Sequence, residues 1–301
     1  MKIVVGSRGS KLALSQTNWV VDKLKENNPE IDFEIKIIKT KGDKIQNIAL
    51  EKIGDKGLFV KEIEEALLNK EIDIAVHSMK DMPSDVPMGL KFSCIPKRED
   101  ARDVLILREG YNSIDDLPQG AKIGTGSKRR KYQLLRYRND LNIVAIRGNV
   151  DTRIRKIDEE NLDGIVLAAA GMHRLGLYDK ISCYIPVEIM IPAPSQGALC
   201  IQIRENEEDL EKILKCIDHE NTRLQVKAER AFLKGVNGSC HIPIGALCEI
   251  NGDKVVIEGL LGNEDGSIIV RKSISGNVDE CENLGYKLSQ IIVEEMRSFE
   301  G

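Results

Sequence analysis

Short apolar runs alternate with amphipathic stretches as far as about residue 200. Apolar or alternating runs are typical of strands, and apolar residues three or four positions apart are typical of helices. The pattern predicts strands at residues 2–5, 32–39, 72–76, 103–107, 121–123, 142–146 and 164–168. It predicts helices between them at residues 10–26, 58–69, 127–138 and 149–160. This alternation predicts an α/β fold with mainly parallel sheets covered on both faces.

The last third of the chain has a different pattern. A strand at 201–204 and helices at 207–219 and 221–234 precede three apolar runs at 244–250, 255–259 and 267–272. The turn signals Asn251-Gly252-Asp253 and Asn263–Gly266 separate these runs, and a final helix is predicted over 278–299. Such turns join antiparallel strands. Residues 219–301 are therefore predicted to form a small α+β domain with an antiparallel sheet.

Two segments suit crossings between lobes, CIPKREDAR (94–102) and IPAPSQG (191–197). They divide the first part of the chain into an αβ lobe at 1–97 plus 197–218 and a second, basic lobe at 98–196. Two lobes joined by two strands would form a cleft with a hinge. The weak likeness between KIVVGSRGSK (2–11) and KIGTGSK (122–128) suits two lobes of similar build.

Composition narrows the class of protein. With 42% hydrophobic and 31% charged residues the chain is typical of a globular protein, and 4% aromatics disfavour nucleic-acid binding by stacking. The longest apolar run, about residues 165–172, is far shorter than the roughly 20 residues of a membrane span. The first ten residues lack the apolar core of a secretion signal. We therefore expect a cytoplasmic protein, without membrane or nucleic-acid partners.

Cysteine and histidine usage disfavours structural metal sites and disulfides. The seven cysteines are odd in number, widely spread and without a CxxC pair, and the four histidines lack partners at ligand spacing. We expect reduced thiols and no metal.

Positive charge is concentrated in one segment. The net charge is −4, from 44 basic and 48 acidic residues, yet residues 122–156 hold eleven Lys or Arg against Asp140 and Asp151, which gives +9 there and −13 elsewhere. A solvated helix face is one interpretation of such a charge run. A basic field in an acidic protein also suits an anionic ligand.

Polar and basic residues follow five of the predicted strands. The segments are GSRGS (6–10), HSMKD (77–81), GTGSKRR (124–130), RGN (147–149) and AGMHR (170–174). Ligands bind beyond the carboxyl ends of strands in open α/β sheets, and helix N-termini favour anions. The phosphate motifs GxxxxGK[ST] and GxGxxG are absent. Arginines on several loops suit a polycarboxylate, or several ligands held together, because each guanidinium can bind one carboxylate.

Three further residues carry candidate chemistry, each with a structural alternative. Asp81 is the acid inside the basic set, and it would either stabilise a cationic intermediate or pair with Lys80 and cap a turn. His77 is best explained as a satisfied structural histidine. Cys240 lies in a loop of small residues, where it is either an accessible reactive thiol or a small inert residue.

In combination these motifs resemble porphobilinogen deaminase, also called hydroxymethylbilane synthase, over essentially the whole chain. The segment ERAFL (229–233) followed by GSCHIPIG (238–245) is similar to the family's cofactor-attachment signature. HSMKDMP (77–83), KGLFVKEIE (56–64), GTGSKRR, RGNVDTR (147–153) and Gln196-Gly197 lie in register with it. The resemblance implies two doubly wound lobes of the type II periplasmic-binding-protein architecture with a hinge, and a small C-terminal domain.

The resemblance also implies a reaction. Four porphobilinogen molecules would be joined head to tail, each losing ammonia through an electrophilic azafulvene, and water would release hydroxymethylbilane. The product would grow on a dipyrromethane cofactor bound to Cys240 by a thioether, and the protein would be a monomeric transferase of porphyrin and haem biosynthesis. Asp81 would be the catalytic residue, stabilising the cation and assisting proton transfers.

The resemblance assigns binding residues by motif position. Those at cofactor-binding positions are Ser78, Lys80, Asp81, Thr125, Ser127, Arg129, Arg130, Arg147 and Cys240. Those at substrate-binding positions are Arg8, Ser10, Gln16, Phe59, Arg147, Arg153, Arg174 and Gln196. Phe59 lies on a segment that would act as a lid.

Some positions depart from the family pattern, and a second function stays open. Gly126 stands where a hydroxyl residue is common, Lys128 where an apolar residue is common, and Ser195 and Ser239 where glycine is usual. These differences leave the charged residues and Cys240 intact. A two-lobed module that binds or senses an organic anion would use the same arginines without requiring Asp81 or Cys240.

Overall fold

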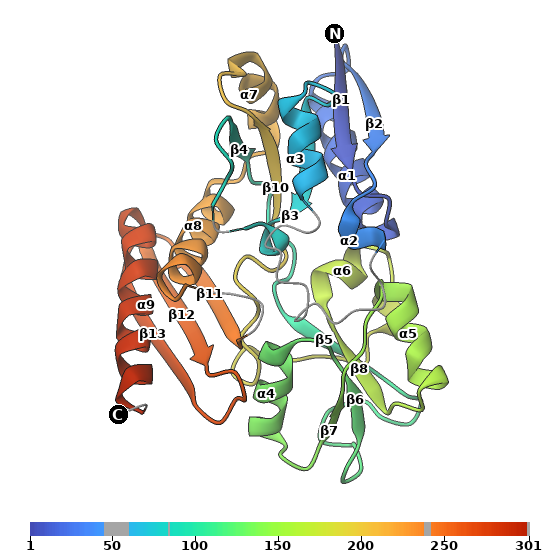
Figure 1. Cartoon of the computed structure of the whole chain (residues 1–301), viewed down its shortest axis with the longest axis vertical. Coiled ribbons are helices and arrows are strands. Elements are labelled where there is room, and N and C mark those ends of the chain that lie inside the picture. Colours follow the sequence, from blue (N-terminus) through green and yellow to red (C-terminus); the bar gives the residue numbers. More distant parts are fainter. Residues whose placement is uncertain (45–59, 84, 238–241, 300–301) are drawn as a thin grey trace. The chain divides into compact units, whose positions relative to one another are not determined.

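The computed structural model describes residues 1–44, 60–83, 85–237 and 242–299 (Figure 1). The chain groups into two units: unit 1 is Met1–Arg98 with Ala198–Arg223, and unit 2 is Glu99–Gly197 with Leu224–Gly301. The change of unit at 98/99 falls within the predicted crossing 94–102, and the change at 197/198 falls at the end of the predicted crossing 191–197. The predicted division into three domains at 97/98, 196/197 and 218/219 stays a prediction.

Unit 1 is built on a mixed five-stranded sheet. Its strands are β1 (Lys2–Ser7), β2 (Asp32–Ile37), β3 (Ile74–Ser78), β4 (Leu90–Cys94) and β10 (Leu199–Arg204), in the order β2-β1-β3-β10-β4. β1 is parallel to β2 and β3, whereas β10 is antiparallel to both of its neighbours. Helices α1 (Lys11–Asn27) and α7 (Glu208–Leu214) pack with Ile3 and Val5, and α3 (Lys61–Leu68) packs with Val4 and Ala75. Because alternate residues of a strand point to opposite faces, both faces are covered.

Unit 2 contains a second five-stranded sheet with helices on both faces. Its strands are β5 (Asp103–Leu107), β6 (Lys122–Gly124), β7 (Asn142–Val144), β8 (Gly164–Ala168) and β9 (Cys183–Tyr184), in the order β7-β6-β8-β5-β9. Leu105 and Leu107 pack in one core with helix α4 (Lys128–Tyr137). Val104 and Ile106 pack in another with α5 (Val150–Glu159) and α6 (Ala169–Arg174).

The two five-stranded sheets share one topology. Each has three parallel strands, then an antiparallel strand that comes directly after a crossing segment, then a short edge strand. The antiparallel strand is β10 in unit 1 and β5 in unit 2. The predicted α/β class is confirmed, but the sequence pattern did not predict the edge strands β4 and β9. Strand β9 has only two residues, and β4 has three half-buried positions in succession, so neither shows a clear strand period.

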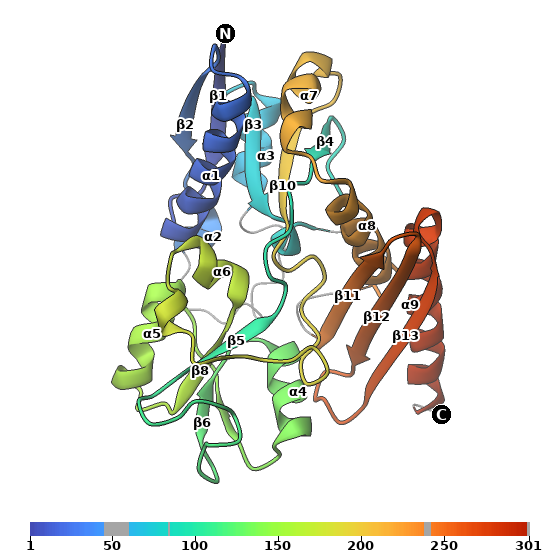
Figure 2. The ribbon, with the colours of Figure 1, turned by 180° about the vertical axis from the view of Figure 1, so that it is seen from behind.

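The C-terminal part of unit 2 forms the predicted antiparallel sheet. Helix α8 (Glu220–Gly235) precedes β11 (Ile244–Asn251), β12 (Lys254–Gly262) and β13 (Ile269–Asn277), which pair in sequence order. Helix α9 (Cys281–Ser298) lies along one face of this sheet, as both views show (Figures 1 and 2). Phe232 is buried against Gly259, where an added Cβ would lie 2.7 Å from the ring. The close approach of this ring therefore requires glycine.

The remaining described elements are short. They are α2 (Lys41–Lys44) and the 3-10 helices Met79–Asp81, Tyr178–Lys180, Lys215–Ile217 and Val278–Glu280. Across the described ranges, no helix is both long enough and apolar enough to span a bilayer.

Ser195 has a strained backbone conformation. Its φ is +62°, in the left-handed region, and its buried Oγ has no hydrogen-bond partner within the described chain. We predict that Ser195→Gly raises the free energy of unfolding by about 1 kcal/mol, because relief of strain outweighs the added chain entropy of glycine. Urea unfolding measures the change. Ser195→Ala, which removes the hydroxyl and keeps Cβ, separates the two causes, and a Ser195→Gly variant no more stable than the parent would contradict the prediction.

Candidate functional site

In unit 1, the predicted site residues follow two adjacent parallel strands. β1 and β3 pair with Val5 opposite Ile74, so their carboxyl ends lie at one edge of the sheet. After β1, the Ser10 side chain caps α1 by accepting a hydrogen bond from the Ala13 amide at 3.3 Å. Gln16, on the first turns of α1, donates to the Ser78 hydroxyl at 3.0 Å. The structure therefore brings Ser10, Gln16 and Ser78 to the same edge, as the strand-end argument predicts.

Lys80 and Asp81 lie on the 3-10 helix that follows β3. Met79 is buried, whereas Lys80 and Asp81 are exposed. Among the described residues, Asp81 has no ion-pair or hydrogen-bond partner, so the alternative pairing with Lys80 is not observed. Its carboxylate is accessible to a ligand.

His77 is a structural residue. It is buried, and its Nε2 lies 3.1 Å from Oε1 of Gln202, whose Nε2 donates to Oε1 of Glu64 at 3.0 Å. Burial lowers the pKa of His77 to about 4, and burial raises the pKa of Glu64. The hydrogen-bonded neutral ring confirms the structural interpretation of His77.

His77 makes stability depend on pH. Its folded-state pKa lies below the unfolded value of about 6.5, so the unfolded chain takes up the proton first and stability falls as the pH drops below about 6.5 toward 4. We predict a loss of about 2 kcal/mol between pH 8 and pH 5 from this residue. Urea unfolding of wild type and His77→Gln at both pH values isolates it. Equal pH slopes for the two proteins would refute this assignment.

In unit 2, the other predicted residues follow β6, β7 and β8. Thr125 is buried after β6, and its Oγ1 accepts from the Ser127 amide at 3.2 Å. Ser127 caps α4 by accepting from the Arg130 amide at 3.4 Å. Arg153 lies on α5 and donates from Nε to the Gly148 carbonyl at 2.8 Å. Arg174 ends α6 and donates to the Gly197 carbonyl at 2.7 Å.

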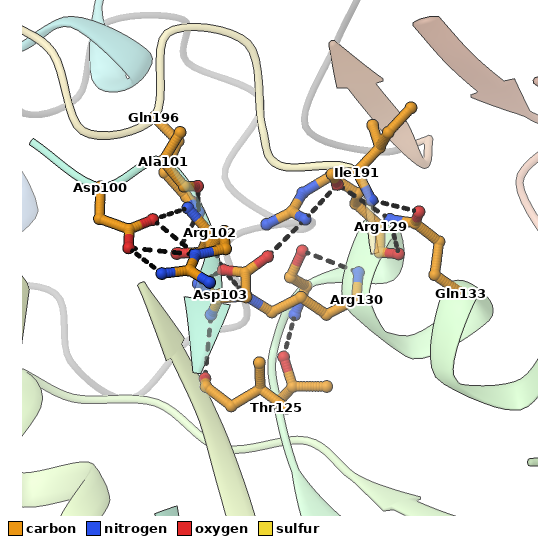
Figure 3. Close-up of polar contacts among 12 residues, drawn as sticks. Asp100, Ala101, Arg102, Asp103, Thr125, Arg129, Arg130, Gln133, Ile191 and Gln196 are labelled. Atoms are coloured by element: carbon orange, nitrogen blue, oxygen red, sulfur yellow. Dashed lines mark hydrogen bonds and ion pairs between the residues drawn. The ribbon is translucent and has the colours of Figure 1, made fainter. Parts of the chain in front are cut away.

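Arg129 and Arg130 are buried around a carboxylate that sequence analysis did not single out (Figure 3). Oδ2 of Asp103 accepts a hydrogen bond from Arg129 Nη1 at 2.7 Å. Oδ1 of Asp103 accepts two from Arg130, from Nη2 at 2.8 Å and from Nε at 3.1 Å. Burial by itself would raise the pKa of Asp103, but the two guanidinium charges outweigh it and hold that pKa well below its usual range. The cluster therefore consists of two cations and one anion.

Asp103 was missed because it stands at the beginning of a strand. In parallel sheets, ligand-binding residues follow the carboxyl ends of strands. Strand β5 is antiparallel to β8 and pairs Asp103 with Ala168. The first residue of β5 therefore lies beside the last residue of β8. An acid opening an apolar strand, beside a crossing segment, is the available sequence signal.

Several other cations of the basic segment are paired within unit 2. Arg138 binds Asp140, Lys128 lies 3.2 Å from Glu264, and Lys156 lies 2.6 Å from Glu160. The interpretation of the charge run as a solvated face therefore holds for part of it. The formal +9 overstates the charge that a ligand would meet.

Arg147 differs from these paired cations. It follows β7 and is half-buried, and its Nη1 is a buried nitrogen without a hydrogen-bond partner in the described part of the chain. An unpaired buried donor on a charged group is costly. A ligand carboxylate would satisfy it.

Gln196 is buried and contributes to the Asp103 cluster. Its Nε2 donates to the Ala101 carbonyl at 2.8 Å and to Asp103 Oδ1 at 3.0 Å. The glycine at position 126, where the family commonly has a hydroxyl residue, is explained by lack of space. An added Cβ would lie 2.8 Å from the Ile146 carbonyl oxygen. The predicted substrate contact of Gln196 stays a prediction.

Two predicted site residues, Phe59 and Cys240, lie outside the described residues. Over the described ranges, no group of three or more His, Cys, Asp or Glu side chains suits a metal ion.

Comparison with known proteins identifies the family. Residues 3–212 match the family model described as porphobilinogen deaminase, dipyromethane cofactor binding domain, and residues 223–294 match the porphobilinogen deaminase C-terminal domain. The chain is 64% identical to the porphobilinogen deaminase of Clostridium novyi (strain NT), covering 98% of this chain and 100% of the relative. It is 62% identical to that of Clostridioides difficile (strain 630), covering 100% of both.

Two solved structures show low similarity to the chain, one of a methionine-binding protein and one of a periplasmic binding protein. The methionine-binding protein MetQ is 14% identical with a TM-score of 0.47, covering 74% of this chain and 92% of that one. A Salmonella typhimurium periplasmic binding protein with high arginine specificity is 15% identical with a TM-score of 0.37, covering 72% and 91%. The two family models together span nearly the whole chain, which therefore belongs to the porphobilinogen deaminase family.

Proposed function

We propose that this chain joins four porphobilinogen molecules head to tail, with release of ammonia, and releases hydroxymethylbilane by hydrolysis. Growth takes place on a dipyrromethane cofactor held by a thioether at Cys240, in a cytoplasmic monomer. Support comes from the two matching family models and from the attachment motif around residues 238–245. As a deaminase of this family, the chain serves tetrapyrrole biosynthesis.

The cationic residues of unit 2 fit a cofactor that carries carboxylates. Buried positive charge in excess of its partners carries this proposal: Asp103 offsets one of the two charges of Arg129 and Arg130, and Arg147 Nη1 lacks a partner among described residues. A buried charge is stable only when it is paired. Acetate and propionate groups would supply the missing anions.

The predicted binding residues divide into those for the cofactor and those for the substrate. Cofactor carboxylates would be held by Thr125, Ser127, Arg129, Arg130 and Arg147, with Ser78 and Lys80 of unit 1. Substrate carboxylates would be held by Arg8, Ser10, Gln16, Arg147, Arg153, Arg174 and Gln196, and Phe59 would be a further substrate contact. Burial lowers the pKa of Arg174 to about 10, so its guanidinium remains charged near neutral pH.

Asp81 is the proposed catalytic residue. When bound, the cofactor supplies a free pyrrole carbon as the nucleophile. The exposed carboxylate of Asp81 would stabilise the cation formed when porphobilinogen loses ammonia, and would accept and return protons at its oxygens. Because Asp81 has no ion-pair or hydrogen-bond partner among the described residues, its carboxylate is available for each addition.

Intact mass spectrometry and turnover test the function together. Protein purified from a host that makes porphobilinogen is expected to carry the mass of two pyrrole units and to consume porphobilinogen with release of ammonia. Only the unmodified mass, together with no consumption, would contradict the proposal. Reversible binding of porphobilinogen without consumption would favour the module that binds or senses an organic anion.

A further inference from the structure

The buried acid at the start of β5 organises the basic pair of unit 2. Asp103 is 0% exposed, Arg129 5% and Arg130 6%. All three nitrogens of the Arg130 guanidinium are bonded, to Asp103 and to the Val166 carbonyl at 3.0 Å. Arg130 and the sheet thus hold the Asp103 carboxylate in a fixed place.

Arg129 is held differently. Among the described residues, its guanidinium bonds only through Nη1, to Asp103 Oδ2 and to the Ile191 carbonyl, both at 2.7 Å. Nε and Nη2 of Arg129 make no hydrogen bond to the described residues. The two bonds of Nη1 fix the orientation of the guanidinium that carries them. Charge-assisted hydrogen bonds of this kind are strong and directional. Arg129 is therefore preorganised to grip a further anion.

The crossing segment 191–197 also helps to fix the two acceptors that bind Arg129 Nη1. The Ile191 amide donates to Gln133 Oε1 at 2.9 Å, and Gln133 donates back to the Ile191 carbonyl at 3.1 Å. At the other end of the segment, Gln196 holds Asp103 Oδ1 (Figure 3). Because both ends are tied by side chains, the two acceptors of Arg129 Nη1 have little freedom to move.

We propose that Asp103 is a positioning residue for cofactor binding: it acts through Arg129, whose free donors take one carboxylate of the dipyrromethane. This inference rests on the proposed function. It adds a role for an acid whose carboxylate oxygens bind Arg129, Arg130 and Gln196. Without the Asp103 carboxylate, Arg129 keeps its charge but loses the partner that orients it.

A double-mutant cycle tests the proposal. Apo-protein is prepared in a host without porphobilinogen, porphobilinogen is added, and the rate of adduct formation is followed by intact mass. Asp103→Asn and Arg129→Met are each expected to slow adduct formation about ten- to a hundredfold, the effect of one charge-assisted hydrogen bond. The double variant is expected to be no slower than Arg129→Met, because coupled residues are not additive. Urea unfolding and circular dichroism verify folding.

The matched control lies at the other end of the same helix. Asp140 pairs with Arg138, with Nη2 to Oδ2 at 2.5 Å, just beyond α4. Asp140→Asn removes another Asp–Arg ion pair of unit 2, one that is partly exposed, and is expected to leave adduct formation unchanged. An effect as large as that of Asp103→Asn would show general destabilisation and overturn the proposal.

The remaining outcomes are decisive as well. If Asp103→Asn does not fold, Gln196→Leu takes its place in the cycle, with a severalfold slowing expected that vanishes in the Arg129→Met background. Wild-type rates in the Asp103 or Gln196 variant, or additive losses with Arg129→Met, overturn the positioning role. Absence of any adduct on wild-type protein would instead count against the proposed function itself.

Discussion

Replacing Asp81 by asparagine is expected to slow turnover about a hundred- to a thousandfold, the usual cost of removing a preorganised electrostatic group. The neutral amide cannot stabilise the cation that porphobilinogen forms or shuttle its protons. Asp81 is exposed, so the substitution is not expected to alter stability. Adduct mass, unfolding and the initial rate of porphobilinogen consumption measure the three properties.

Asp85→Asn is the control for Asp81. Asp85 is an exposed acid four residues further along the chain. Its replacement is expected to leave the rate unchanged. Near-normal turnover by Asp81→Asn would remove Asp81 from the catalytic role, even with the adduct in place.

Replacing Cys240 by serine is expected to abolish both the covalent adduct and hydroxymethylbilane formation. Serine is close in size but lacks the nucleophilic thiolate, so no thioether can form. The intact mass is expected to be that of the bare chain even when porphobilinogen is supplied. Turnover is expected to fall below detection, because no primer is retained.

The control for Cys240 is an exposed thiol elsewhere in the chain. Cys216 is exposed in unit 1, and its Sγ donates a hydrogen bond to the Ile213 carbonyl. Cys216→Ser is expected to keep the adduct and the rate. An adduct on Cys240→Ser, or its loss in Cys216→Ser, would place the attachment elsewhere.

Elements with a strong apolar period could be predicted closely. Strands β5 and β8 have the predicted bounds, and α4 and α5 begin and end within a residue or two of their predicted limits. Their signals are local, because a strand or helix repeats its contacts every two or three to four residues. Strands β4 and β9 have weak periods, and the reversed direction of β5 and β10 has no local signal.

The candidate site was predictable in its residue types but not in their pairing. Strand ends led to Ser78, Ser127 and Arg147, whose binding roles stay predictions. They could not show that Arg129 and Arg130 share Asp103, which lies 26 and 27 positions away. They also could not show that Gln196 is tied to Asp103 from 93 positions away.

The sequence by itself determined the strands, helices and turns with clear periods, the family motifs, and the types of residue available for chemistry. Those depend on contacts between near neighbours in the chain and on side-chain identity. Tertiary structure alone decided which cations are already neutralised, that Asp103 pairs with Arg129, and that His77 is buried and neutral. Such outcomes depend on which distant segments meet and how much water they exclude, since burial and a nearby opposite charge set the state of an ionisable group.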